Sequence, residues 1–378
     1  MTRARIQRRS FLKGAASVTI VVANGEVWRA FSQSTSAYGE GPAFAPWKTW
    51  KQDSQDGPLA LVRAAILSSN AFNSQPWLFK VSAASIELFA DIRRNLGAFD
   101  PCLRELHFSL GCALENLLLT ASANAYKASV TIAPGKLEAL ASKPEPKRVA
   151  SIELVRGKPA PSELYDAIPN RHTNRDPFDP RKPLPADFLD ALNHSAATDK
   201  DVRLFLFTAQ PQRKKLVDAV IAGSALMADP AVQSGLHPWF RATMEDLQKS
   251  PDGSYVGPGG PFKPGTLEQY ATLMLSAPLF GLIAVRDRYD IPQTVRAGQF
   301  WQRAHLLATA RGVAARPANG AVEFIDYEKQ LNQPPHASDL LAKITGDALW
   351  QPTFMFYMGH ATQPALASAR RSAQDVLV

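Results

Sequence analysis

The sequence predicts an α+β protein in which two related halves share one chain. Each half joins a strand that ends in acidic and arginine residues, 90–94 and 284–288, to a long apolar helix, near 104–125 and 293–315. A constant offset of 187 residues relates the two helices and pairs Gly111 with Gly298, Leu119 with Leu306, Ala121 with Ala308, and Ala123 with Ala310. Because small residues on an apolar helix let a second backbone come close, we expect these helices to pack against each other.

The first half is predicted to span residues 45–150. Apolar residues at helical spacing from 56 to 67 predict a helix, which leads into a loop rich in Asn and Ser. Strands are expected at 77–81 and 86–90, and alternation over 149–155 predicts a further strand. Residues 134–150 contain prolines and lysines and are interpreted as a linker or an exposed excursion.

The second half is predicted to span 151–378, with a fresh unit starting near Ser162. Its expected elements are helices near 186–192 and 322–331 and strands at 202–207, 277–285 and 353–358. Residues 208–270 are predicted to be an insertion with two helices and a Gly/Pro loop. Such a loop is typical of a lid over a pocket or of a surface excursion.

The N-terminal 37 residues predict an export signal. Arg8-Arg9-Ser10-Phe11-Leu12-Lys13 matches the twin-arginine pattern, and the mildly apolar stretch behind it is too short to span a bilayer. The alternative is a basic helix at the terminus. We expect export through the twin-arginine translocase to the periplasm or another extracytoplasmic space, without a permanent membrane span. This route carries folded proteins, which suits a cofactor inserted before export.

Composition argues against nucleic-acid binding. The first 30 residues hold six basic side chains against one acidic side chain, so their removal would lower the net charge from +8 to +3. No basic patch interleaved with aromatic residues is evident. The two cysteines, Cys102 and Cys112, lack metal-ligand spacing and are expected to be buried thiols, with a bridge between them left open. No metal site is predicted.

The loop Ser68-Ser69-Asn70-Ala71-Phe72-Asn73-Ser74-Gln75-Pro76-Trp77 is the first candidate binding segment. Asn73 and Gln75, two apart and fixed by a proline, would suit a polar ring that needs donors and acceptors along one edge. The alternative is an ordinary helix-to-strand turn, since Ser, Asn and Pro are common turn residues.

Arg171, Thr173 and Arg175 form the second candidate. Two guanidinium groups four residues apart around a hydroxyl could bind a dianion such as phosphate through paired, charge-assisted hydrogen bonds. The alternative is a salt-bridged loop, because Asp176 and Asp179 lie close by in sequence.

Asn73-Ser74-Gln75-Pro76-Trp77 resembles the Asn-x-Gln-Pro-Trp signature of flavin-dependent nitroreductases. These are α+β homodimers in which both subunits hold each FMN, so the resemblance implies FMN as cofactor and extends over about residues 57–378. It assigns Arg171, Thr173 and Arg175 to the phosphate together with the basic pair Arg370 and Arg371. It assigns Asn73 and Gln75 to the ring, places Ser69 and Asn70 beside it, and brings backbone N–H groups of Asn319 and Gly320 to the flavin N5.

Each half retains the motif that the other half lacks, which is similar to the Acg-type branch, where one chain mimics the dimer. The resemblance therefore implies a monomeric pseudo-dimer with one complete and one extinct FMN site. Two departures concern the ring edge: Ser68-Ser69-Asn70 replaces the usual Ala-Pro-Ser, and Phe72 stands where the branch often has His.

The resemblance implies an FMN-dependent oxidoreductase that passes two electrons to a small organic acceptor, without a catalytic side chain. An exported enzyme would be separated from cytoplasmic NAD(P)H, so its electron donor is unknown. The alternative is an exported protein that binds and sequesters FMN without turnover.

Overall fold

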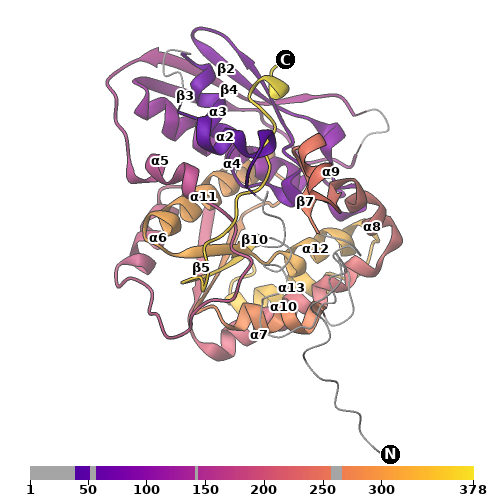
Figure 1. Cartoon of the computed structure of the whole chain (residues 1–378). Helices are drawn as coiled ribbons and strands as arrows, with labels where there is room; N and C mark the ends of the chain where they lie inside the picture. The colour runs from indigo at the N-terminus through magenta and orange to yellow at the C-terminus, as the bar shows by residue number, and fades with distance from the viewer. Residues whose placement is uncertain (1–38, 52–56, 141–143, 257–265) are drawn as a thin grey trace, which may run out of the picture.

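The computed structural model describes residues 39–378 except 52–56, 141–143 and 257–265. The predicted twin-arginine segment lies outside the described residues. Two four-stranded antiparallel sheets dominate the architecture, and two long helices lie between them (Figure 1).

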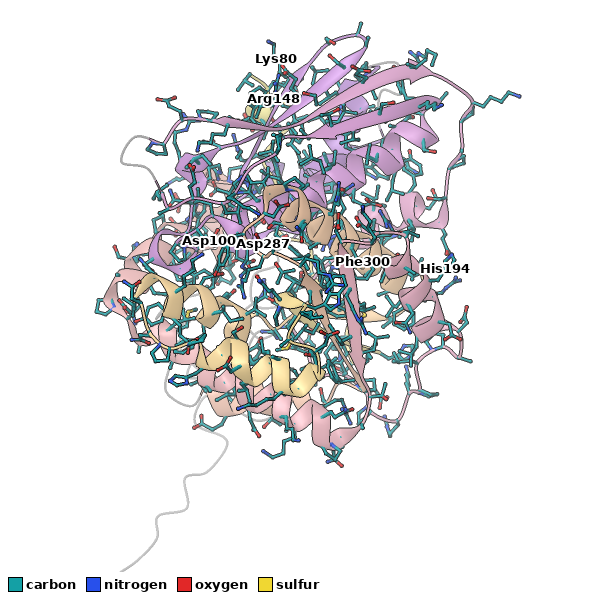
Figure 2. All side chains as sticks on the ribbon, turned by 180° about the vertical axis from the view of Figure 1, so that it is seen from behind. Lys80, Asp100, Arg148, His194, Asp287 and Phe300 are labelled. Carbon is teal, nitrogen blue, oxygen red and sulfur yellow. The ribbon has the colours of Figure 1, made fainter. Side chains whose placement is uncertain are left out.

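The first sheet has the strand order β1-β2-β4-β3 and is antiparallel throughout. Its strands are β1 Trp77–Val81, β2 Ser85–Ala90, β3 Tyr126–Ile132 and β4 Lys147–Arg156. One face packs on the core, where β1 and β2 bury Trp77, Phe79, Ile86 and Leu88. The outer face is polar: Glu87 pairs with Lys80 and Arg148, which lie at the outside of the sheet (Figure 2).

The second sheet has the strand order β5-β8-β10-β9 and is also antiparallel throughout. Its strands are β5 Val202–Phe207, β8 Leu279–Val285, β9 Ala314–Pro317 and β10 Gln351–Gly359. All seven residues of β8 are buried, because helices cover both faces of the sheet at its centre. A continuous apolar run, rather than an alternating one, is what a strand buried on both faces requires.

The two sheets share one connectivity. In each, the second strand leads into a 20-residue helix, α4 Arg104–Ala123 or α11 Ile291–Ala310, and the third strand follows it. The helices pack on each other and serve both cores: α11 buries Val295 against the first sheet, and α4 buries Phe108 against the second.

The predicted close approach of these helices is confirmed at their glycines. A Cβ on Gly111 would overlap the carbonyl oxygen of Val295, and a Cβ on Gly298 would overlap the carbonyl oxygen of Phe108. Val295 and Phe108 are themselves 187 residues apart, so the two contacts are reciprocal. Glycine is required at both positions because the backbones leave no room for a side chain.

The remaining elements cover the sheets or connect them. In the first half these are η1 Pro42–Phe44, α2 Ala45–Thr49, α3 Leu59–Ala65, η3 Ala71–Asn73, η4 Ile92–Arg94 and η5 Gly97–Phe99. The connection to the second half and the second half itself contain α5 Glu163–Ala167, η6 Ile168–Asn170, α6 Phe188–Ala197, α12 Gly320–Gln330, α13 His336–Thr345 and η9 Gln374–Val376.

The segment between β5 and β8 corresponds to the expected insertion and contains more structure than two helices. Its elements are α7 Gln210–Gly223, η7 Ser224–Ala228, α8 Pro230–Leu236, η8 His237–Trp239, β6 Phe240–Arg241, α9 Met244–Lys249, β7 Ser254–Tyr255 and α10 Thr266–Leu275. Helices α7, α10, α12 and α13 pack on the second sheet (Figure 1). No single helix in the described ranges is long and apolar enough to cross a membrane, although the bent pair Gln210–Ala228 and Pro230–Trp239 meets that criterion jointly.

Three predictions about the elements need correction. The boundary at 150/151 is wrong, because β4 runs from Lys147 to Arg156 and pairs with β2 and β3 of the first sheet. The presumed excursion at 134–150 therefore already contains the start of that strand. Strands β3 and β9 and helix α13 were missed. The seven residues of β3 alternate between apolar and polar, so its signal was present in the sequence, whereas β9 has only four residues and contains Pro317.

The C-terminal segment returns to the first sheet. Leu377 forms a parallel bridge with Phe79, and the Val378 amide donates a 3.0 Å hydrogen bond to the Phe79 carbonyl. The segment thereby brings Arg370 and Arg371 beside the loop at 68–76. The two cysteines are free thiols, with Cys112 buried and Cys102 half-buried.

Candidate functional site

A cavity of about 420 Å³ lies where both halves, the insertion and the C-terminal segment meet. Of the predicted site residues, Ser69, Asn70, Asn73, Arg171, Thr173, Arg175, Asn319, Gly320 and Arg370 line it. Gln75 and Arg371 do not line it. The structure therefore brings the amide-rich loop together with arginines that lie about 100 residues (Arg171 and Arg175) and about 300 residues (Arg370) further along the chain.

The loop at 68–76 is held in a strained conformation at the rim of the cavity. Phe72, Asn73 and Gln75 have φ angles of 49°, 54° and 50°, in the left-handed region that side chains disfavour. Bonds to the loop compensate: the Gln75 amide donates to Asn70 Oδ1 at 2.8 Å, and the Ala71 amide donates to Ser109 Oγ at 3.2 Å. Strain that is over-determined by surrounding contacts is typical of functional loops.

The Asn73 side chain joins three segments. Its Nδ2 donates to the carbonyls of Gly253 at 3.0 Å and Ala369 at 2.9 Å, and its Oδ1 accepts from Arg370 Nη1 at 2.6 Å. Both N–H groups of the amide are thus used within the protein. In this arrangement Asn73 organises the rim and holds Arg370, which also lines the cavity.

Gln75 also connects segments. It is fully buried, donates from Nε2 to the Pro251 carbonyl at 2.8 Å and accepts at Oε1 from the Arg371 backbone amide at 2.9 Å. Arg371 in turn bonds the Asp375 carbonyl. These contacts fix the C-terminal segment and the insertion to the loop, outside the cavity lining.

Arg171 is a buried cation at the cavity, with 2% of its surface exposed. Its guanidinium donates to Ser69 Oγ at 3.1 Å and to the Leu67 carbonyl at 3.2 Å, and it lies 3.4 Å from Nδ1 of His305. Its Nε has no hydrogen-bond partner among the described residues, and no carboxylate pairs with it there. Burial lowers the pKa of Arg171 to about 10, which still leaves it charged at neutral pH.

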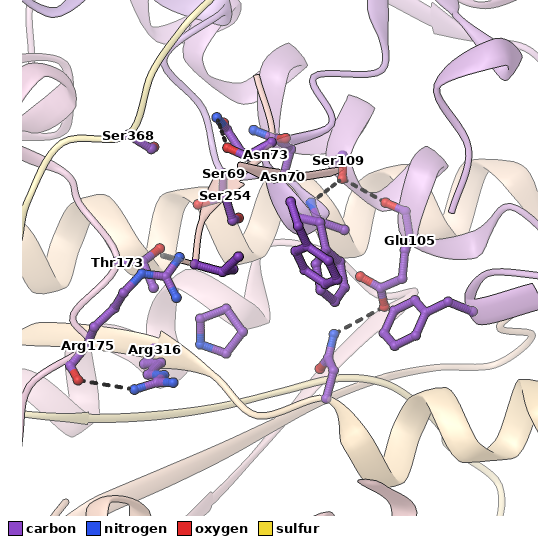
Figure 3. Close-up of a pocket in the computed structure, with 18 of the residues that line it drawn as sticks. Ser69, Asn70, Asn73, Glu105, Ser109, Thr173, Arg175, Ser254, Arg316 and Ser368 are labelled. Carbon is purple, nitrogen blue, oxygen red and sulfur yellow. Dashed lines mark hydrogen bonds between the residues drawn. The ribbon is translucent and has the colours of Figure 1, made fainter. Parts of the chain in front are cut away.

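Four arginines gather at this end of the cavity. Arg171 and Arg370 both lie over the ring of Trp47, with guanidinium carbons 5.8 and 4.9 Å from the ring centre. Arg316 donates to the Arg175 carbonyl at 3.3 Å, and Figure 3 shows both beside Thr173. Arg171 and Arg370 are buried, Arg316 is half-buried and Arg175 is exposed. Such a group of guanidiniums next to a hydroxyl is suited to a phosphate or another dianion.

Aromatic side chains form the middle of the cavity. Phe108 and Phe354 stack with ring centres 4.4 Å apart, and Trp301 lies 4.7 Å from Phe354. All three line the cavity, with Cys112 beside them. They come from α4, α11 and β10, so rigid elements provide an apolar wall for a flat ligand.

Carboxylates occupy the other end. Glu105 lies opposite Arg175 and Arg316 in Figure 3. It accepts a hydrogen bond from Asn319 Nδ2 at 3.1 Å and forms an ion pair of 2.8 Å with Arg104. Glu323 also lines the cavity. Burial raises the pKa of Glu105, and burial together with Glu105 raises the pKa of Glu323 well above its usual range.

Asn319 and Gly320 lie at the start of α12. The Asn319 side chain bridges the halves, because its Oδ1 accepts from the Met355 amide at 2.7 Å while its Nδ2 reaches Glu105. Helix α7 lies so close that a Cβ on Gly320 would be 2.8 Å from the Val220 carbonyl oxygen. The chain at the cavity therefore has little room to move toward α7.

No family model matches the chain. Two proteins of Mycobacterium tuberculosis, from strains CDC 1551 and H37Rv, carry the provisional name NAD(P)H nitroreductase. Each is 24% identical to this chain over 296 residues, which are 76% of this chain and 82% of the relative. An FMN-bound nitroreductase structure from Desulfitobacterium hafniense is 15% identical and covers 58% of this chain and 98% of its own, with a TM-score of 0.36. An FMN-dependent nitroreductase from Mycobacterium smegmatis in complex with NADPH is 15% identical, with coverages of 56% and 96% and a TM-score of 0.38.

Several cavity residues were missed by sequence reasoning, among them Glu105, Phe108, Trp301, Arg316, Glu323 and Phe354. Most of them belong to helices or strands whose periodicity assigns them to a core. A charged residue on an otherwise apolar helix, such as Glu105 in α4, was the available signal.

Proposed function

We propose that this chain binds one FMN and acts as a nitroreductase-like oxidoreductase that passes two electrons to a small organic acceptor. The observation that carries the proposal is Arg171, a buried guanidinium with an unpartnered Nε at a cavity that also contains Thr173. A buried cation without a carboxylate is costly unless a ligand supplies the negative charge. The two named relatives add support, since they match over three quarters of the chain.

The cavity residues fit FMN. Arg171, Thr173, Arg175 and Arg316 would hold the phosphate, and the stacked pair Phe108 and Phe354 with Trp301 would pack on the ring. Asn70, which lines the cavity, would present its amide to the ring edge. The volume of about 420 Å³ lies in the usual range for a cofactor pocket.

When bound, FMN would supply the electron-transfer chemistry itself. The protein's part is to bind the phosphate, to orient the ring and to limit the access of water. The strained loop at 68–76 and the start of α12 are positioned to orient it, because both lie on the cavity and are fixed by hydrogen bonds to other elements.

We further infer a fused pseudo-dimer of the Acg type with one working site. Shared sheet connectivity and the reciprocal glycine contacts support this duplication. On the cavity side, Gln302 bonds Asn116 at 2.8 Å and the Ser69 amide at 3.0 Å. The residues related by the 187-residue offset are Glu115 and Arg303, which form an ion pair of 2.8 Å instead. An ion pair at the corresponding place supports the loss of the second site.

The first experiment is to purify the folded chain, record its visible spectrum and quantify FMN per chain. One tightly bound FMN is expected, and a colourless protein that takes up no FMN would contradict the proposal. Photochemical reduction followed by mixing with nitroaromatic or quinone acceptors then measures turnover.

Sequestration of FMN without turnover is the second candidate. It is favoured by the way the insertion is fixed across the loop: Asp252 pairs with both Arg94 and Arg241, and the Gly253 amide donates to the Asn73 carbonyl at 2.9 Å. Bound FMN that reoxidises no faster with acceptors than with air would favour sequestration. Rapid reoxidation by acceptors would favour the enzyme.

Export by the twin-arginine route is part of the proposal and rests on the motif at Arg8 and Arg9. An exported enzyme would need a reductant other than cytoplasmic NAD(P)H. Replacing both arginines by lysine should retain the protein in the cytoplasm, and fractionation of cells checks this. Unchanged export of the double variant would contradict it.

A further inference from the structure

Carboxyl groups outnumber guanidiniums at the acidic end of the cavity. Four carboxyls, from Asp100, Glu105, Glu323 and Asp326, surround Arg104 and Arg288. The last two carboxyls belong to α12, and Arg288 lies in the segment between β8 and α11. Other titratable groups also face this cluster. Tyr289, Cys102 and Lys329 interact with its Asp326 side, Tyr270 interacts with Glu323, and Cys112 interacts with Glu105. The cluster therefore carries two more acids than bases.

Asp326 forms ion pairs with both guanidiniums. Its Oδ2 accepts from Arg104 Nε at 2.7 Å and from Arg288 at 3.0 Å, and its Oδ1 accepts from the Tyr289 hydroxyl at 2.8 Å. Its pKa is lowered by the two guanidiniums, with Arg288 acting most strongly against burial. Asp326 therefore stays ionised and balances one of the two arginines.

Glu105 pairs with the part of the Arg104 guanidinium that does not contact Asp326. Glu105 forms an ion pair of 2.8 Å with that guanidinium, and it accepts a hydrogen bond of 3.1 Å from Asn319. Within the described part of the chain, the Asp100 carboxyl accepts hydrogen bonds from two backbone amides, those of Glu105 at 3.0 Å and Leu106 at 2.9 Å. Burial raises its pKa to about 7.

Glu323 differs from the other three carboxyls in its contacts. Among the described residues its carboxyl makes no hydrogen bond or ion pair, yet it lines the cavity beside Gly320 and Asn319. Glu323 is half-buried, and a carboxyl close to other carboxyls favours its neutral form, in the way that paired aspartates share one proton. A protonated Glu323 has an O–H that is free to donate into the cavity.

We propose that Glu105 and Glu323 hold one proton between them and that the Glu323 carboxyl recognises the electron acceptor by donating a hydrogen bond to an uncharged oxygen, such as a quinone carbonyl. This inference rests on the proposed function for the identity of the acceptor. The arginines hold the anionic end of the cofactor at the opposite end of the cavity, so the acidic end meets the part of a ligand that carries no phosphate. An acceptor with its own carboxylate or sulfonate is disfavoured there, because like charges would meet in a poorly hydrated site.

The proposal predicts binding that depends on pH in a defined direction. The proton is present below the raised pKa of the pair and is lost as pH rises through it, so the O–H donor disappears at alkaline pH. Loss of one hydrogen bond should weaken binding about three- to tenfold. Naphthoquinone is the neutral probe, and naphthoquinone sulfonate is its charged counterpart.

The experiment compares the full-length wild type with Glu323→Gln and with the matched control Glu328→Gln. Glu328 is a buried glutamate on the same helix that accepts from the Ala337 amide and does not line the cavity. Affinity for both quinones is measured by calorimetry with oxidised protein between about pH 6 and pH 9. Infrared difference spectroscopy over the same pH range detects the C=O band of a protonated carboxyl.

In the wild type and Glu328→Gln, naphthoquinone should bind more tightly than the sulfonate and should weaken as pH rises. In Glu323→Gln the affinity should be independent of pH, and the protonated-carboxyl band assigned to Glu323 should be absent. The Asp100 carboxyl, whose pKa is raised to about 7, contributes a band in every variant, so the difference between variants is what is read. A pH dependence of quinone affinity that survives in Glu323→Gln, or a protonated-carboxyl band as strong as that of the wild type, would overturn the inference. If the purified protein takes up no FMN and Glu323 still gives the protonated-carboxyl band, the proposed function would be contradicted but the shared proton would be supported.

Discussion

Arg370 donates a 2.6 Å hydrogen bond to the side-chain oxygen of Asn73, although 297 residues separate them in the chain. The contact joins the C-terminal segment to the strained loop of the first half. Arg370 also donates to the Ser68 carbonyl at 3.1 Å and lies over Trp47. The C-terminal segment and the loop at 68–76 therefore close one side of the cavity together.

Asn73→Ala should lower the free energy of unfolding by about 2–4 kcal/mol. The change removes three hydrogen bonds and leaves buried partners unsatisfied. Asn332→Ala is the matched control, since Asn332 is exposed and has a similar φ of 52°. Denaturant titration compares the two variants. Equal destabilisation would show that backbone conformation, not the side-chain contacts, accounts for the effect.

Arg171→Gln should weaken FMN binding by about 10- to 100-fold, because a charge-assisted bond to phosphate contributes about 1.5–3 kcal/mol. Arg181→Gln serves as the control: Arg181 is exposed and pairs with Asp179. FMN content after dialysis and fluorescence titration measure the effect. Retention of FMN in Arg171→Gln would place the phosphate elsewhere.

Gly298→Ala should destabilise the protein by more than about 3 kcal/mol, or prevent folding, because the new Cβ would overlap the Phe108 carbonyl. Gly157→Ala should change stability by no more than about 1 kcal/mol, since a Cβ there would find its nearest atom at 3.7 Å. Thermal melting tests both. A well-folded Gly298→Ala with an unchanged melting temperature would contradict the close helix crossing.

Stability should fall as pH drops below about 6.5. Burial lowers the pKa of His172 to about 3, and burial lowers that of His305 well below its usual range. Between these values and the unfolded pKa, the unfolded chain binds more protons, so acid favours unfolding by up to about 1.4 kcal/mol per pH unit for each histidine.

His172→Phe should reduce this pH dependence, because it removes a titrating group and keeps a ring against Trp47. His194→Gln, at an exposed position of α6, should leave the pH dependence unchanged. Melting temperatures between about pH 4 and pH 8 provide the measurement. A His172→Phe profile parallel to the wild type would show that His172 also titrates normally when folded.

Asp252→Asn should speed the release of bound FMN and increase protease cleavage near 250–256. The carboxylate joins Arg94 of the first half to Arg241 of the insertion, with about 13% of its side chain exposed, and the amide cannot pair with both charges. Stopped-flow fluorescence after dilution measures the rate of FMN release, and timed proteolysis measures the cleavage near 250–256. Asp218→Asn, which breaks an exposed pair with Lys214, is the control and should behave as wild type.

Much of the secondary structure follows from the local pattern of apolar residues. Strands 77–81 and 202–207 match β1 and β5 at both ends, because their apolar residues recur with the period of a strand. The offset between Gly111 and Gly298 also predicted the helix crossing, since only glycine fits two backbones in contact. The boundary at 150/151 failed because sheet partners, which single-strand patterns do not encode, decide where β4 belongs.

The site was only partly contained in the sequence. Local chemistry was sufficient to select Arg171 and Thr173, because clustered guanidiniums around a hydroxyl indicate an anion wherever they fold. Tertiary structure decided that Gln75 and Arg371 hold segments together outside the cavity and that Asn73 bonds Arg370. It also decided that Glu105 and Glu323, 218 residues apart, share one end of the cavity, since packing across the chain and not spacing along it sets which charges meet.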